Sequence, residues 1–307
     1  MNERDPEFEP LRRDVAGLPR RIEPPRDLWP GIAARLDRTA RERPMRRVWI
    51  PLLAAAAGIL LIVVARRGGV RLDVRALAGH PTVTAGAVAT DDSSRARIAL
   101  TIGTLDLEPG SQLRAIAVGA REQRFALERG AIAARVDAPP RVFIVETPSA
   151  TATDLGCAYT LRVDSAGNGE LHVTAGVVEL GMAGRLAIVP IGARAALRAG
   201  VGPGTPTVDD APAALRSALD AFDFRNGGPD ALAAALAAAR SADGLTLWHL
   251  LSRAPAPLRG SVFDRLAAMV PPPAGVTREG VLRLDATMLD AWWDYVPGTV
   301  WRARPKK

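Results

Sequence analysis

The sequence predicts a membrane-anchored α+β protein with one transmembrane helix, an all-β domain of solenoid-like or sandwich-like form, and a small helical C-terminal domain. Three observations support this fold class. Residues 48–65 form an uncharged apolar run, residues 82–199 contain short alternating apolar segments, and residues 211–307 contain apolar residues at helical spacing. The remaining segments are expected to be a cytoplasmic tail, a juxtamembrane linker and an interdomain linker, at residues 1–47, 66–81 and 200–210.

The apolar run from Val48 to Ala65 is bounded by Arg46-Arg47 on one side and Arg66-Arg67 on the other. As a helix it would be about 27 Å long, slightly shorter than the roughly 30 Å hydrocarbon core of a bilayer. Trp49 and the long stems of the flanking arginines would cover the difference. We interpret the run as a transmembrane helix, the alternatives being a buried core helix or a signal sequence.

Arginines near the two ends of this run predict its orientation. They are more numerous on the amino side, which places the amino end in the cytoplasm and the carboxyl end in the periplasm of a single-pass inner-membrane protein. A start at Met45 would instead give a signal peptide, but the long leader before Met45 argues against it. The arginines counted are Arg35, Arg38, Arg41, Arg43, Arg46 and Arg47 before the run, and Arg66, Arg67, Arg71 and Arg75 after it.

The cytoplasmic tail contains one candidate partner-binding segment. Residues 1–26 are rich in Pro, Arg and acidic residues, and we expect them to be disordered. Asp27 is a potential cap for a short amphipathic helix that follows. A docking peptide for a cytosolic partner and an interfacial helix on lipid headgroups are both consistent with this pattern. The candidate binding residues are Leu28, Ile32 and Leu36 on one face, with Trp29 beside them.

The β domain is predicted from short, evenly spaced strands separated by Gly, Pro and Asp. Asn168-Gly169 is a hairpin signal because both residues tolerate positive φ. The candidate strands are Arg97–Ile102, Gln112–Ala117, Arg124–Leu127, Ile132–Val136, Val142–Thr147, Cys157–Val163, Glu170–Thr174, Val177–Leu180 and Leu186–Val189.

Five segments of this domain, in order, resemble the motifs of FecR domains. The resemblance covers about Thr82 to Leu197, with Cys157 in place of the usual Thr and Tyr159 in place of Phe. It implies an inner-membrane signal transducer whose periplasmic β domain receives a signal and whose cytoplasmic tail acts on an extracytoplasmic-function sigma factor. The segments are Leu107–Leu113, Leu127–Ala131, Phe143–Pro148, Ala152–Tyr159 and Val173–Leu180.

The carboxyl part of the chain predicts four or five short helices joined by Pro/Gly turns. Helical spacing indicates helices over Pro212–Phe222 and from Pro229 through Arg240. We expect Asp243, Ser261 and Asp285 to cap three more. Trp248, Trp292 and Trp293, together with His249, are interpreted as core residues rather than a ligand platform.

Composition argues against several functions. The formal charge of +7 comes almost entirely from Arg, with Lys only at Lys306 and Lys307, so it is weak evidence for nucleic-acid binding, and no direct nucleic-acid partner is expected. Cys157 is the only cysteine; it can form no internal disulfide, and we expect it to be a small buried residue. No hydrolase elbow, phosphate loop or zinc-protease motif is present. We therefore expect no enzyme activity, no cofactor and no metal.

The sequence thus predicts a regulator of an alternative sigma factor, with the lipid bilayer, a cytoplasmic sigma factor and an unidentified periplasmic or outer-membrane protein as partners. The alternative is an envelope binding or scaffold protein that uses the β domain without a transcriptional partner.

Overall fold

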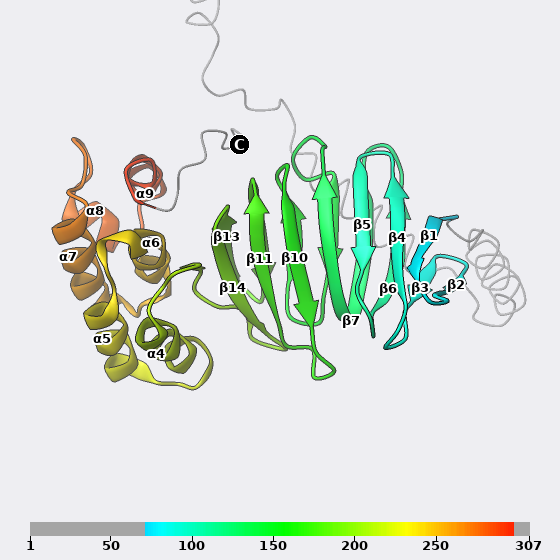
Figure 1. The fold of residues 1–307 in the computed structure, drawn as a ribbon. Helices are drawn as coiled ribbons and strands as arrows, with labels where there is room; N and C mark the ends of the chain where they lie inside the picture. The colour runs from blue at the N-terminus through cyan, green and yellow to red at the C-terminus, as the bar shows by residue number, and fades with distance from the viewer. Residues whose placement is uncertain (1–70, 298–307) are drawn as a thin grey trace, which may run out of the picture. The chain divides into compact units, whose positions relative to one another are not determined.

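A computed structural model describes residues 71–297, which belong to one compact unit of the chain (Figure 1). The tail, its candidate residues Leu28, Trp29, Ile32 and Leu36, and the apolar run at 48–65 lie outside the described residues. Within residues 71–297, no helix has the length and hydrophobicity needed to span a bilayer.

The β domain consists of two hydrogen-bonded sheets that share one strand. Figure 1 shows β4, β5, β7, β10 and β11 side by side. Sheet A contains β1 (Asp73–Ala78), β4 (Arg95–Leu100), β5 (Gly103–Leu107), β10 (Ala158–Val163), β11 (Gly169–Ala175), β14 (Ala193–Arg198), β15 (Gly202–Pro203) and β16 (Thr207–Val208). Sheet B contains β2 (Thr82–Thr84), β3 (Ala87–Ala89), β6 (Gln112–Val118), β8 (Phe143–Glu146), β9 (Thr151–Asp154), β12 (Val177–Met182) and β13 (Arg185–Pro190).

The shared strand is β7 (Gln123–Val136). Its first half pairs with β6 and β8 in sheet B, and its second half pairs with β5 and β10 in sheet A. Gly130 lies between the halves with φ +93°, and a Cβ atom there would stand 2.3 Å from the Ser111 Cα atom. The Ser111 hydroxyl accepts a hydrogen bond from the Ala131 N–H at 2.9 Å. The bend that joins the sheets therefore requires glycine and is held by a side chain from the β5–β6 turn.

One core fills the space between the sheets. Inward residues from both sheets belong to the same buried cluster, in which the rings of Phe125 and Phe143 lie 5.8 Å apart. The mostly β domain is therefore a nearly closed, barrel-like arrangement of two joined sheets, close to the sandwich-like form predicted. A β-solenoid is built by parallel stacking of successive coils. Among the described strands only β7 and β8 pair in parallel, so these strands do not fit the solenoid-like alternative.

All nine predicted strands overlap observed ones, with differences in detail. The segments Arg124–Leu127 and Ile132–Val136 are halves of β7 rather than separate strands. β1 lies within the predicted juxtamembrane linker, where it pairs with β4, and β15 and β16 lie within the predicted interdomain linker.

The β10–β11 hairpin is present, but its turn differs from the predicted two-residue type. The turn residue with positive φ is Gly167, at +79°, and the Asp164 carboxylate accepts hydrogen bonds from the Ala166 and Asn168 N–H groups. Gly169 already pairs with Val163 in the ladder. The Asp164 side chain therefore organises a longer loop than the Asn168-Gly169 pair predicts.

The helices pack around a second buried cluster. Asp285 caps α9 as predicted, accepting from the Met288 N–H at 3.0 Å. Ser261 does not cap a helix: it lies inside α7, which starts earlier because a 3₁₀ turn at Ala256–Leu258 leads into it. The helices are α4 (Ala213–Phe224), α5 (Gly228–Ala238), α6 (Gly244–Arg253), α7 (Arg259–Met269), α8 (Arg278–Leu282) and α9 (Ala286–Trp293), with a further 3₁₀ turn at Ser241–Asp243.

Candidate functional site

The clearest built arrangement of polar groups lies where α6 covers the outer edge of β13. We call this contact the β13–α6 seam; it comprises Leu186 and Ile188 of β13 and His249 and Arg253 of α6. The two α6 residues are four positions apart, so they lie on the same face of the helix, one turn after the other. The predicted binding residues of the tail lie outside the described part of the chain.

His249 is buried in the seam with both ring nitrogens hydrogen-bonded. Its Nε2 atom accepts from the Ile188 backbone N–H at 3.0 Å, so Nδ1 carries the proton and donates to the Leu245 carbonyl at 2.9 Å. Burial, with a smaller contribution from the nearby Arg253 charge, lowers the pKa of His249 to about 3. The imidazole is therefore neutral in the folded protein, as its acceptor role requires.

Arg253 occupies the next turn and is almost fully buried. Its guanidinium donates to the carbonyls of Leu186 at 3.1 Å, Pro203 at 2.9 Å and Gly204 at 3.1 Å, and to the Asp223 carboxylate at 3.2 Å. Burial lowers the pKa of Arg253, and the Asp223 charge opposes that effect. An arginine remains charged under these conditions, so the seam contains a buried ion pair whose hydrogen bonds join helix, strand and turn.

Asp223, at the end of α4, completes this group. Its carboxylate is 3% exposed, accepts from the Thr205 N–H at 2.6 Å, and lies 3.7 Å from the Arg185 guanidinium. The ion pair therefore joins α4 and α6 to the start of β13.

Together His249 and Arg253 hydrogen-bond two backbone groups on the outer edge of β13. Alternate residues of an edge strand direct their N–H and C=O groups outward. On β13, the Ile188 N–H is taken by His249, the Leu186 carbonyl by Arg253, and Pro190 has no N–H. Side chains of α6 thus take the place of a neighbouring strand, which is one way that proteins protect sheet edges. The arrangement couples the helices to the β domain.

The tryptophans lie beside the seam and pack on one another. The rings of Trp248 and Trp293 meet edge to face at 4.6 Å, and the Trp248 indole N–H donates to the Leu289 carbonyl at 3.2 Å. Trp292 and Trp293 are buried. The interpretation of this cluster as core is confirmed.

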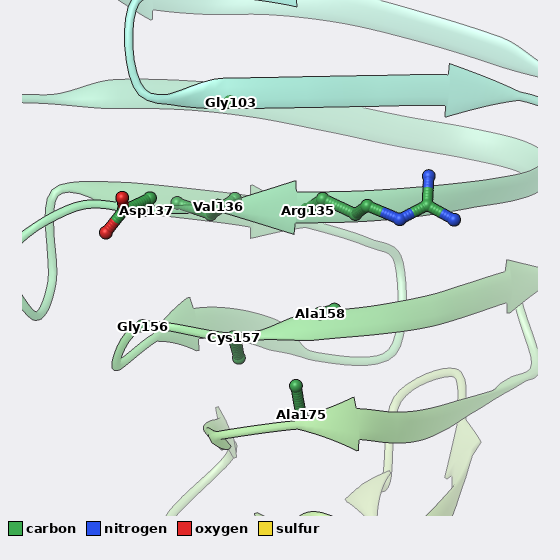
Figure 2. Close-up of a pocket in the computed structure, with 8 residues that line it drawn as sticks. All are labelled: Gly103, Arg135, Val136, Asp137, Gly156, Cys157, Ala158 and Ala175. Carbon is green, nitrogen blue, oxygen red and sulfur yellow. The ribbon is translucent and has the colours of Figure 1, made fainter.

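A second feature is an open depression of about 390 Å³ at one end of sheet A (Figure 2). It lies where β7 and β11 end and where β5 and β10 begin. In Figure 2, the side chains of Arg135 and Asp137 extend in opposite directions. The lining residues are Gly103, Arg135, Val136, Asp137, Gly156, Cys157, Ala158 and Ala175.

Cys157 lines this depression but is not activated for chemistry. It is buried as predicted, and its thiol donates to the Asp154 carboxylate, which also accepts from the Gly156 N–H at 2.7 Å. Burial raises the pKa of Asp154 to about 6 and raises the pKa of Cys157 far above its usual value, with the Asp154 charge adding to the effect on the thiol. A neutral thiol is a poor nucleophile, so the depression contains no reactive cysteine.

A comparison with protein families finds a match within the β domain. Residues 86–179 match the model of the family described as FecR protein. The matched range contains four of the five motif segments completely and most of the fifth, and it includes the bend at Gly130. The resemblance to FecR domains is thereby confirmed. No curated protein matches the chain.

Two crystal structures are also similar to part of the chain, both of a "putative anti-sigma factor" from Parabacteroides distasonis ATCC 8503. The 1.65 Å structure is 18% identical, with a TM-score of 0.37, and the match covers 44% of this chain and 64% of that one. The 2.50 Å structure is 17% identical, with a TM-score of 0.36, and the match covers 43% and 62%. The chain thus spans less than two thirds of the length of either structure.

Proposed function

We propose that this chain, which carries a FecR domain at residues 86–179, is a regulatory protein of the bacterial inner membrane. Its β domain receives a signal in the periplasm, and its amino-terminal tail passes that signal to a cytoplasmic partner, an extracytoplasmic-function sigma factor. The observation that carries the proposal is the match of residues 86–179 to the FecR family. The uncharged run from Val48 to Ala65 and its flanking arginines support the membrane location.

Co-purification of the full chain tests the partner. Tagged protein is extracted from membranes of the native host in a mild detergent, and the retained proteins are identified by mass spectrometry. We expect to recover a sigma factor that is lost when residues 1–47 are deleted. Recovery of envelope proteins alone, with no sigma factor under conditions that preserve the complex, would favour the alternative of an envelope binding or scaffold protein.

Reporter fusions test the topology separately. A reporter that is active only in the periplasm is expected to be active when fused after Leu197 and inactive when fused after Arg43. The reverse pattern, or a soluble mature product that begins near Arg66, would contradict the membrane orientation without depending on the sigma factor.

A further inference from the structure

The outer edge of β1 has no pairing strand among the described residues. β1 pairs with β4 on one side, and within residues 71–297 no strand pairs with its other side. The side chains of β1 are exposed except for Val74, which packs partly on the core, and Leu77 is 44% exposed. An edge of this kind presents a row of free N–H and C=O groups to another strand. This differs from the β13 edge, which α6 covers.

Two opposite charges on β1 share the outward face and have no charged partner in the described part of the chain. Side chains alternate along a strand, so Asp73 and Arg75 point to the side opposite Val74. Within residues 71–297, neither makes an ion pair or a side-chain hydrogen bond. On β4, the residue opposite Arg75 is Arg97, whose guanidinium is already held by Asp106 at 2.6 and 2.7 Å. Arg75 thus faces a like charge on β4 and has no counter-charge among residues 71–297.

We propose that β1 pairs in antiparallel fashion with β1 of a second copy of this chain, about a two-fold axis at Val74. In this register Val74 faces the partner's Val74, and Asp73 faces the partner's Arg75. The two-fold symmetry repeats this contact, so Arg75 also faces the partner's Asp73. Opposite charges directly across an antiparallel pair are stabilising, whereas like charges are destabilising.

The charges select this register over its neighbours. A shift by two residues in one direction places Asp73 against the partner's Asp73, and the same shift in the other direction places Arg75 against the partner's Arg75. A shift by one residue moves side chains to the wrong face of the sheet. β1 is therefore self-complementary in one antiparallel arrangement.

The pairing closes on itself. A two-fold contact uses the same edge on both copies, so it produces a dimer and no filament. The irregularity between Ala76 and Ala78 ends the regular ladder of β1, which limits the contact to a few residues. Since stable interfaces bury more surface than one strand pair provides, we expect a reversible dimer.

Cysteine cross-linking of the full chain tests the register. Val74→Cys places two thiols at the two-fold axis, where facing Cα atoms are about 4.5–5.5 Å apart, a separation that a disulfide accepts. Ala78→Cys is the matched control, because its two copies would be about 26 Å apart. Mild oxidation is expected to give a disulfide-linked dimer with Val74→Cys and none with Ala78→Cys. The native Cys157 is present and buried in both variants.

Charge exchange in the Val74→Cys background tests the contacts. Asp73→Arg or Arg75→Asp alone places like charges opposite each other, and each is expected to reduce cross-linking at least fivefold. The double exchange, Asp73→Arg with Arg75→Asp, restores opposite charges and is expected to restore cross-linking. Because both side chains are exposed, the thermal melting of all variants should match that of the parent.

Two results would overturn the proposal. One is cross-linking at position 78 as fast as at position 74, and the other is failure of the double exchange to recover what the single exchanges lose. Light scattering of the purified full chain, corrected for detergent, gives an independent measure. A protein mass of 32.5 kDa at every concentration tested would exclude the dimer, and a concentration-dependent approach to twice that mass would support it.

Discussion

The His249 imidazole accepts a hydrogen bond from the backbone N–H of Ile188 at 3.0 Å, across 61 residues of sequence. A protonated imidazole has no lone pair to accept with, so this bond exists only when His249 is neutral. The attachment of α6 to the β13 edge is therefore linked to the protonation of one buried side chain.

Acid is expected to weaken the folded protein through His249. Its pKa is about 3 when folded and about 6.5 when unfolded. As pH falls from about 6.5 toward 3, the unfolded chain binds a proton that the folded chain does not, so the free energy of unfolding decreases. At pH 5 the loss from this residue is about 2 kcal/mol, measurable by urea unfolding at pH 7 and pH 5.

His249→Gln is the control for this effect, because an amide oxygen can accept from Ile188 but does not titrate. We expect the variant to lose about 2 kcal/mol less than the parent between pH 7 and pH 5. Asp154 acts in the opposite sense: its raised pKa makes stability fall as pH rises from about 4 toward 6. Asp154 is present in both proteins and cancels in the comparison. Identical pH dependence of the two would contradict the assignment to His249.

Arg253→Ala is expected to destabilise the protein by about 3–5 kcal/mol, because it leaves the Asp223 carboxylate buried without its main counter-charge. Arg283→Ala is the contrast: this exposed arginine pairs with Glu279 one turn away on the surface, and its loss should cost at most about 0.5 kcal/mol. Urea unfolding measures both. If removal of Asp223 and Arg253 together cost as much as the two single changes added, the residues would not act as a pair.

Gly130→Ala is expected to disrupt the bend of β7. The new Cβ atom would meet the Ser111 backbone in a conformation with positive φ. Gly184→Ala separates the two effects, because Gly184 has φ +78° but open space around it. We expect a loss of about 1–2 kcal/mol for Gly184→Ala and a further 1–3 kcal/mol for Gly130→Ala, measured by thermal melting. Equal losses would show that the contact with Ser111 is unimportant.

The Cys157 thiol is expected to resist alkylation in the folded protein. It is 5% exposed and its pKa is raised by burial and by Asp154, so little thiolate is available at pH 8. A thiol reagent should label it slowly in buffer and stoichiometrically in 8 M urea, in about the time that free cysteine requires. Rapid labelling without denaturant would indicate that the end of sheet A opens readily.

Trp29→Ala tests the predicted helix of the tail. If its apolar face docks on a sigma factor, loss of the aromatic anchor should cost about 2 kcal/mol, roughly thirtyfold in affinity. Ala34→Ser, on the opposite side of the predicted helix, should leave binding unchanged. Affinity is measured with the full chain in detergent and without lipid. Wild-type affinity of the Trp29 variant would favour the interfacial helix.

Much of the fold follows from local pattern, and the exceptions have physical causes. Strands such as Glu170–Thr174 alternate between polar and apolar residues and could be predicted. β1 could not, because it lies at an edge and buries almost none of its side chains. The sequence does not predict β14 either: its residues, Ala-Arg-Ala-Ala-Leu-Arg, favour a helix, but pairing with β11 places Ala193, Ala195 and Leu197 in the core. Tertiary pairing there overrides local propensity.

The contacts of the β13–α6 seam could not be predicted from the sequence, for a different reason. The sequence predicted His249 as a core residue, and it is buried. Its partner is a backbone N–H of a distant strand, and no side-chain motif marks such a donor. Arg253 resembles the many other arginines of the chain until the fold surrounds it with carbonyls from β13 and the turn near Pro203. The capping residue Asp285 was predictable because its acceptor role is completed within three residues.

The continuity of β7 has a consequence for degradation. In many folded proteins, a protease can remove a terminal helix or strand and leave a folded remainder. Here a cut near Gly130 would detach a central strand from each sheet at once, because β6 and β8 depend on its first half and β5 and β10 on its second. Neither fragment would keep a complete core. The amides of β7 should therefore exchange with solvent only when the whole domain opens, and digestion should produce no stable intermediate that ends within this strand.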